Sequence, residues 1–141
     1  MGSMIWGPLA AGFLSGKYQR DAARPDGSRL ARLPTLPTVP DWDHAFRVLD
    51  VMQEIAARRE VPVGQVAINW LSSKPWVTTV ILGASTLPQL QELLGSAGWR
   101  LSAEEAASLD AVSEVTPLRY PYWGQRLGAP ERNPPLKGFR E

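Results

Sequence analysis

Residue types that could do chemistry are few in this 141-residue chain, and they do not cluster. It has no cysteine, and His44 is its single histidine. This composition excludes a structural disulfide, a thiolate metal site and a cysteine nucleophile, and one histidine cannot form a metal cluster with others. General acid catalysis needs a positioned group with a tuned pKa, and none is visible. The sequence therefore predicts neither catalytic nor metal-ligating residues.

A glycine-rich segment is instead suited to bind a ligand through its backbone. Residues 3–6 form a short apolar run stopped by Gly7 and Pro8, which predicts a buried strand that ends in a turn. Gly12 and Gly16 follow among small residues. Such a bare backbone can lie close against a ligand, and backbone amides suit phosphate oxygens.

A second turn of this kind closes the β-branched run at residues 77–82. This run predicts a strand that ends at Gly83. Thr86, with Gln89 three residues on, fits a capping box at the start of a third helix, which Gly95 and Gly98 would end.

The rest of the sequence predicts helices, a loop and an irregular tail. Apolar spacing predicts helices over residues 42–59 and 63–72. A Ser102–Glu105 capping box predicts a further helix through about residue 113. Residues 21–40 and 114–141 are rich in proline, and we predict a loop and an irregular tail there.

Alternating strands and helices favour an α/β fold with a parallel sheet. Two strands cannot cover both faces of such a sheet, and a β/α barrel needs eight. The chain is therefore expected to be part of a larger α/β assembly, or to complete its sheet with a partner.

Charge and hydropathy exclude other classes of partner. The net charge is +1, so no long-range field steers the chain to nucleic acid or anionic lipid. No apolar run approaches the roughly 18 residues of a membrane span, and no signal peptide is visible. We expect a soluble cytoplasmic protein.

Three motifs in consistent order resemble the aldo-keto reductase family. Residues 6–18 resemble the segment at its seventh barrel strand, where an aromatic residue precedes a Gly-rich stretch ending in Gly-Lys-Tyr. Residues 81–90 resemble its eighth-strand motif, and residues 66–71 the helix before that strand. The resemblance implies that residues 1–123 are the C-terminal portion of a (β/α)8 TIM barrel, incomplete on its own, followed by an irregular tail at 124–141.

The resemblance also implies a nicotinamide-dinucleotide site. Trp6 matches the residue that stacks on the nicotinamide, and the next turn would wrap the pyrophosphate. The turn after residue 82 would face the adenosine ribose and its phosphate, with Gln89 near adenine. The implied cofactor-binding residues are Trp6, Gly7, Leu9, Gly12, Ser15, Gly16, Gly83, Ala84, Ser85 and Gln89.

Two departures leave the choice between NADP(H) and NAD(H) open. Members that prefer NADPH usually carry Arg or Lys just after the Gly-Ala turn, whereas Ser85, Thr86 and Leu87 stand here. A charged donor binds phosphate more strongly than a neutral one. The Asn that often contacts adenine in the family is replaced by Leu93.

The family's proton-transfer residues, Tyr, Lys, His and Asp, come from earlier strands that have no counterpart here. The resemblance therefore implies the cofactor-binding part of a carbonyl reductase, completed by a missing N-terminal half. A free-standing nucleotide-binding module without chemistry, and a structural remnant that self-associates through exposed strand edges, remain as alternatives.

Overall fold

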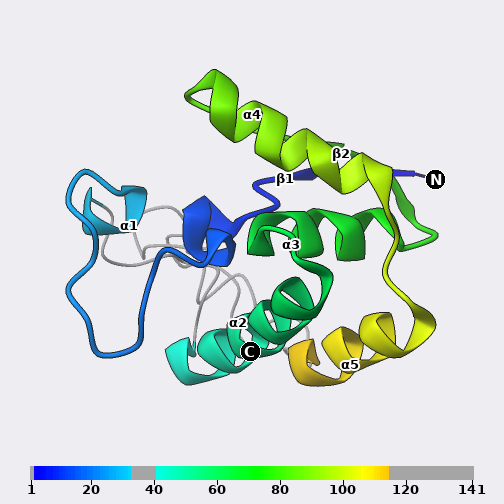
Figure 1. Cartoon of the computed structure of the whole chain (residues 1–141), viewed down its shortest axis with the longest axis horizontal. Coiled ribbons are helices and arrows are strands. Elements are labelled where there is room, and N and C mark those ends of the chain that lie inside the picture. Colours follow the sequence, from blue (N-terminus) through cyan, green and yellow to red (C-terminus); the bar gives the residue numbers. More distant parts are fainter. Residues whose placement is uncertain (1, 33–40, 115–141) are drawn as a thin grey trace, which may run out of the picture.

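A two-stranded parallel sheet lies against layered helices in residues 2–32 and 41–114, the part of the chain that the computed structural model describes (Figure 1). Helix α3 runs along one side of the strands, and α2 and α5 lie beyond it. The elements are β1 (Ser3–Trp6), the 3-10 helix η1 (Ala10–Ser15), α1 (Arg29–Arg32), α2 (Trp42–Arg59), α3 (Val63–Ser72), β2 (Val77–Ile81), α4 (Leu87–Leu94), the 3-10 helix η2 (Gly95–Gly98) and α5 (Ala103–Ser113).

The parallel pairing of β1 with β2 confirms the predicted sheet. Trp6 is in register with Ile81 and Met4 with Thr79, while an irregularity between Ser3 and Met4 shifts the register. Parallel strands need a long crossover, and α2 and α3 provide it. The observed fold is thus mixed α/β, as expected.

Helix α2 matches its predicted span of 42–59. The Asp41 carboxylate accepts a hydrogen bond from the His44 backbone N–H at 3.0 Å, which caps the helix. This bond is the main reason that the pKa of Asp41 is lowered. Leu49, Met52 and Ile55 form the buried stripe that the three- and four-residue spacing predicts.

Helix α3 is the most buried helix in the described segments, and it carries two polar side chains into the interior. Val66 and Ala67 pack in the core as predicted, but Gln65 and Asn69 are buried as well. The Asn69 amide donates to the Ser96 and Trp99 carbonyls and accepts from the Leu101 backbone N–H. The α3 amides therefore fix the connection between α4 and α5.

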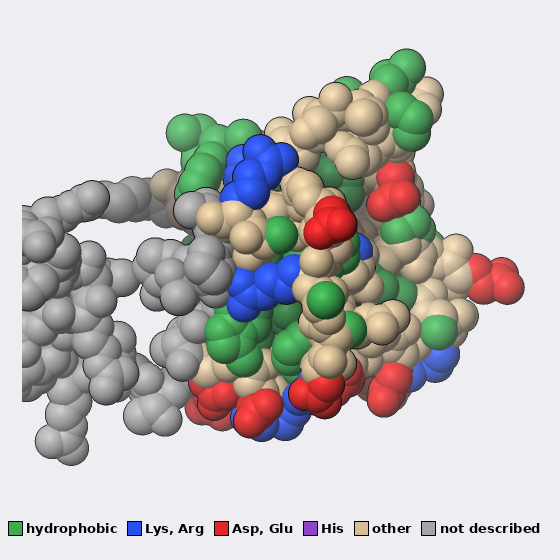
Figure 2. All heavy atoms as spheres, turned by 90° about the vertical axis from the view of Figure 1, so that its left-hand side faces the viewer, with side chains coloured by type: hydrophobic (Ala, Val, Ile, Leu, Met, Phe, Trp, Pro, Cys, Tyr) green, Lys and Arg blue, Asp and Glu red, His purple; other side chains and the backbone are tan. Residues whose placement is uncertain are grey.

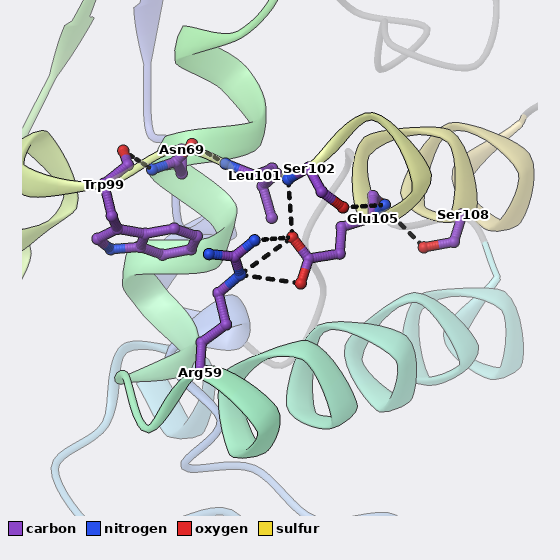
Figure 3. A network of polar contacts seen from close by, with 7 residues as sticks. All are labelled: Arg59, Asn69, Trp99, Leu101, Ser102, Glu105 and Ser108. Atoms are coloured by element: carbon purple, nitrogen blue, oxygen red, sulfur yellow. Dashed lines mark hydrogen bonds and ion pairs between the residues drawn. The ribbon is translucent and has the colours of Figure 1, made fainter.

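An ion pair between Arg59 and Glu105 joins α2 to α5 (Figure 3). Ser102 and Glu105 form the reciprocal capping box predicted for α5. Nearby, the Trp70 indole and Lys74 both donate to Asp110. The layer of helices is thus tied together by polar contacts as well as by apolar packing.

Three sequence-based expectations need correction. β1 was expected to be buried, but the Trp6 side chain is 81% exposed and Met4 70% exposed, because only the face toward α3 is covered. The expected loop at residues 21–40 contains the single-turn helix α1. Thr86 caps α4 as predicted, but the Gln89 side chain accepts a hydrogen bond from the Ser85 N–H rather than from the Thr86 N–H.

Candidate dinucleotide site

The two predicted binding turns leave the sheet side by side. Trp6 ends β1, Ile81 ends β2, and the two residues are paired in register. Since parallel strands share one carboxyl edge, the turn beginning at Gly7 and the turn around Gly83 emerge at the same place. This edge is where open α/β sheets generally bind ligands.

The turn after Trp6 follows an unusual backbone path. Gly7 and Gly12 have positive φ angles of 68° and 90°, and Ala10 and Ala11 share this left-handed region at 47° and 58°. Such angles are strained for alanine. The Leu9 carbonyl holds the turn by accepting the Gly12 and Leu14 N–H groups at 2.9 and 3.1 Å.

The turn after β2 is open and polar. Gly83, Ala84 and Ser85 are exposed, and a methyl group placed on Gly83 would meet nothing within 4 Å. The Ser85 N–H donates to Gln89 Oε1 at 3.0 Å, and the Thr86 hydroxyl accepts the Gln89 N–H at 3.4 Å. Gln89 therefore links this turn to the first turn of α4.

Lys17 is a site residue that sequence reasoning missed. A methyl group placed on Gly12 would lie 3.2 Å from Lys17 Nζ, so this ammonium stands over the glycine turn. It also lies 5.3 Å from the centre of the Tyr18 ring. In the sequence, Gly16-Lys17-Tyr18 stands out only as part of a motif, although a lysine one residue after a left-handed glycine can fold back over its own turn.

The segment that begins at Lys17 carries a net positive charge. Residues 17–32 contain five basic and two acidic side chains. Figure 2, which faces the side of the molecule carrying η1 and α1, shows basic side chains beside hydrophobic ones. The basic residues are Lys17, Arg20, Arg24, Arg29 and Arg32.

Three of the predicted residues have structural roles in their turns. The Ser15 hydroxyl donates to the Gly12 carbonyl at 2.8 Å. Gly16 ends η1 with a φ of 80°, and a methyl group there would touch Val63. The Leu9 side chain packs on the main core. Trp6, the glycines 7, 12 and 83, Ala84, Ser85 and Gln89 remain as the accessible edge.

Two hollows lie among the helices and loops of the described residues, and Pro8 and Leu14, which follow β1, line the first of them. One, of about 200 Å³, is apolar and is bounded by α2, α3 and α5. The other, of about 180 Å³, is lined by Phe13, Tyr18, Trp42, Gln19 and residues 21–24 among others. No group of acidic or histidine side chains suited to a metal occurs within 2–32 and 41–114. In the same residues, no helix combines the length and the apolar character required to cross a bilayer.

Comparison with known proteins decides the family. The model of the aldo/keto reductase family matches residues 1–114. The chain belongs to the aldo/keto reductase family. Aldo/keto reductases fold as (β/α)8 barrels, and the parallel β1–β2 pair with its crossover helices is compatible with part of such a barrel.

Several known proteins align with most of the chain. Pyridoxal reductase, chloroplastic, from Arabidopsis thaliana is 32% identical over 113 residues, covering 79% of this chain and 28% of the relative. L-glyceraldehyde 3-phosphate reductase from Escherichia coli O157:H7 is 31% identical over 119 residues, covering 78% and 33%. A second Arabidopsis thaliana protein, named "Probable voltage-gated potassium channel subunit beta", is 37% identical over 94 residues, covering 65% and 28%. The chain thus spans about a third of the length of these relatives.

Proposed function

We propose that this chain is the C-terminal, cofactor-binding part of an NAD(P)H-dependent oxidoreductase. In this proposal β1 and β2 are the seventh and eighth strands of a (β/α)8 barrel, and the dinucleotide lies across their carboxyl edge. When bound, it would supply a hydride for reduction of a carbonyl group. The proton-transfer residues would come from a part of the barrel outside this chain. The register of Trp6 with Ile81 carries the proposal, because it brings both turns to one edge.

The residues at the edge fit the parts of a dinucleotide. The exposed Trp6 indole offers a flat apolar face of the kind that covers a nicotinamide ring. Lys17 Nζ and the left-handed turn at Gly12 offer a cation and close backbone approach for the pyrophosphate. The open turn at Gly83 leaves room for the ribose.

Within the described part of the chain, the groups that would meet a 2′-phosphate, at residues 83–86, are all neutral. Ser85 and Thr86 present hydroxyls, and the Ser85 N–H is occupied by Gln89. The basic residues on either side of this turn in the sequence are Lys74 and Arg100. Lys74 pairs with Asp110, and Arg100 donates to the Ala97 and Trp99 carbonyls. We therefore expect little discrimination between NADPH and NADH.

Calorimetric titration of the purified chain with NADPH and with NADH tests this function. Trp6→Ala should abolish or strongly weaken saturable binding. Trp76→Ala should leave binding unchanged, because Trp76 is also exposed but lies just before β2, at the amino end of the strands. Circular dichroism would confirm that both variants are folded. A folded wild-type chain that binds neither dinucleotide would refute cofactor binding by this chain.

A further inference from the structure

Two neighbouring alanines carry backbone strain in the turn that follows β1. Ala10 and Ala11 have φ angles of 47° and 58°, and Gly12 continues the run at 90°. Residues with a Cβ atom enter this left-handed region rarely, and then as single residues rather than in a run. Asp21 and Glu60 also have positive φ angles in the described part of the chain, but each stands alone. The adjacent pair of alanines therefore needs an explanation of its own.

Contacts on both sides of the turn hold this backbone in place. The Ala10 N–H donates to the Gly7 carbonyl at 3.0 Å, and the Leu9 carbonyl accepts two N–H groups from further along the turn. The side chains of Ala10 and Ala11 pack against a buried cluster. This cluster consists of Phe13, Tyr18, Leu30 and Leu49. Strained residues persist only where the surrounding structure determines their conformation, and they gather at sites that bind ligands.

The strained path leaves a backbone donor available in the turn. In a regular 3-10 turn the Ala11 N–H would bond the carbonyl of Pro8, three residues earlier. Among residues 2–32 and 41–114, no acceptor receives the Ala11 N–H. Lys17 Nζ stands over the next residue, Gly12. A free N–H group and an ammonium group in one turn suit the oxygens of an anionic ligand.

We propose that Ala10 and Ala11 are positioning residues for the dinucleotide, and that the chain gives up stability to hold the turn in its binding conformation. This inference rests on the function proposed above. A turn that is already ordered loses little conformational freedom when the ligand binds, so the affinity is higher. Glycine at either position would relieve the strain and would also let the turn adopt other conformations. Stability and affinity should therefore change in opposite directions, which a merely structural role would not produce.

Ala10→Gly, Ala11→Gly and the double variant test the inference in two measurements on the purified chain. Thermal unfolding should show a melting temperature about 2–4 °C higher for each single variant, because the relief of strain outweighs the freedom that glycine adds to the unfolded chain. Calorimetric titration of the double variant should show the binding of NADH and NADPH weakened about equally, by roughly tenfold. The binding entropy should become less favourable, because the turn must now be ordered by the ligand.

Glu60→Gly is the matched control. Glu60 is exposed and ends α2 in the same left-handed region, with a φ angle of 53°, but it is not part of the turn. Glycine is the residue preferred at such helix ends. The melting temperature of this variant should therefore rise, while its affinity for both dinucleotides stays that of the wild type. Circular dichroism verifies that each variant is folded.

Two results would overturn the inference. The first is equal affinity in the wild type and in the folded double variant, which would remove the positioning role. The second is a melting temperature that fails to rise in the alanine variants, which would show that the turn stores no strain that glycine relieves. A wild-type chain that binds neither dinucleotide would refute the proposed function and the positioning role with it, whereas the melting temperatures would still decide whether the turn is strained.

Discussion

Arg59 Nη2 lies 2.6 Å from Glu105 Oε2, and Arg59 Nε donates to both oxygens of the same carboxylate at 2.9 and 3.0 Å (Figure 3). Glu105 Oε2 also accepts the Ser102 backbone N–H at 2.8 Å. One carboxylate therefore closes the capping box of α5 and anchors the end of α2. The guanidinium lies 5.2 Å from the centre of the Trp99 ring, which adds a cation–π contact.

Acid should weaken the fold through Glu105. Hydrogen bonding from Arg59 lowers the pKa of Glu105 from 4.5 to about 2. A carboxyl with a lowered folded pKa contributes stability above its unfolded value and loses this contribution as the pH falls toward its folded value. The free energy of unfolding should therefore decrease from about pH 4.5 toward pH 2.

Glu105→Gln isolates this effect, because glutamine can keep the capping bond while removing the charge. The variant should be less stable at pH 7 by about 1 kcal/mol and should show a smaller acid-dependent decrease in urea unfolding experiments. Glu104→Gln, one residue earlier and exposed, provides the control. An equal acid response in wild type and Glu105→Gln would contradict the assignment.

Removing the Asn69 amide should be costly. Asn69→Ala would leave the half-buried Leu101 N–H and two carbonyls without this partner. An unsatisfied buried polar group typically costs about 1–3 kcal/mol, so we expect a loss of about 2–3 kcal/mol in urea unfolding. Gln91→Ala, at an exposed position of α4, should change stability by less than about 0.5 kcal/mol. Similar values for the two variants would show that the amide network contributes little.

A pair of glycine substitutions tests the packing at the end of α4. In Gly95→Ala, the new methyl group would lie 2.4 Å from Gln65 Nε2, whereas nothing lies within 4 Å of the same position at Gly98. Gln65 donates to the Glu92 carbonyl and accepts from the Trp99 indole, so it cannot move without losing these bonds. Gly95→Ala should lower the melting temperature and cost about 1–3 kcal/mol.

Gly98→Ala should be close to neutral, and it serves as the control for the loss of glycine flexibility. A melting temperature unchanged in Gly95→Ala would mean that the Gln65 side chain has another position of similar energy.

Lys17 should contribute to dinucleotide affinity through charge. Lys17→Gln should weaken NADPH and NADH binding about equally, by roughly tenfold, which corresponds to about 1.4 kcal/mol. The loss should shrink as salt is added, since exposed charges are screened. Calorimetry at two salt concentrations measures both effects. Arg58→Gln removes an exposed charge from the far end of α2, and a matching loss there would attribute the effect to net charge alone.

The regular elements could be predicted from the sequence because local chemistry determines them. Helix α2 follows from its apolar spacing and the Asp41 cap, and the start of α5 follows from the Ser102–Glu105 box. The parallel sheet follows from the alternation of strands and helices. In these places, short-range hydrogen bonds and burial favour the same structure.

Other features depend on contacts between distant residues. The burial of Gln65 and Asn69 could not be predicted, because their partners lie 27–34 residues away in sequence. Helix α1 was missed since it lies in a proline-rich loop and has a single turn. The exposure of Trp6 reflects what surrounds the strand, and an apolar run alone does not reveal that. The site residues share an edge in the structure, but their binding roles stay predictions.

The two buried amides of α3 also determine how this part of the molecule can move. Gln65 holds the last turn of α4, and Asn69 holds the link to α5. A shift of α4 along its axis would break these bonds together, so α3, α4 and the start of α5 should behave as one rigid body. Through Arg59 and Glu105 this body is coupled to the far end of α2. Force applied at Gln89 would then be transmitted through α3 to the opposite layer of helices.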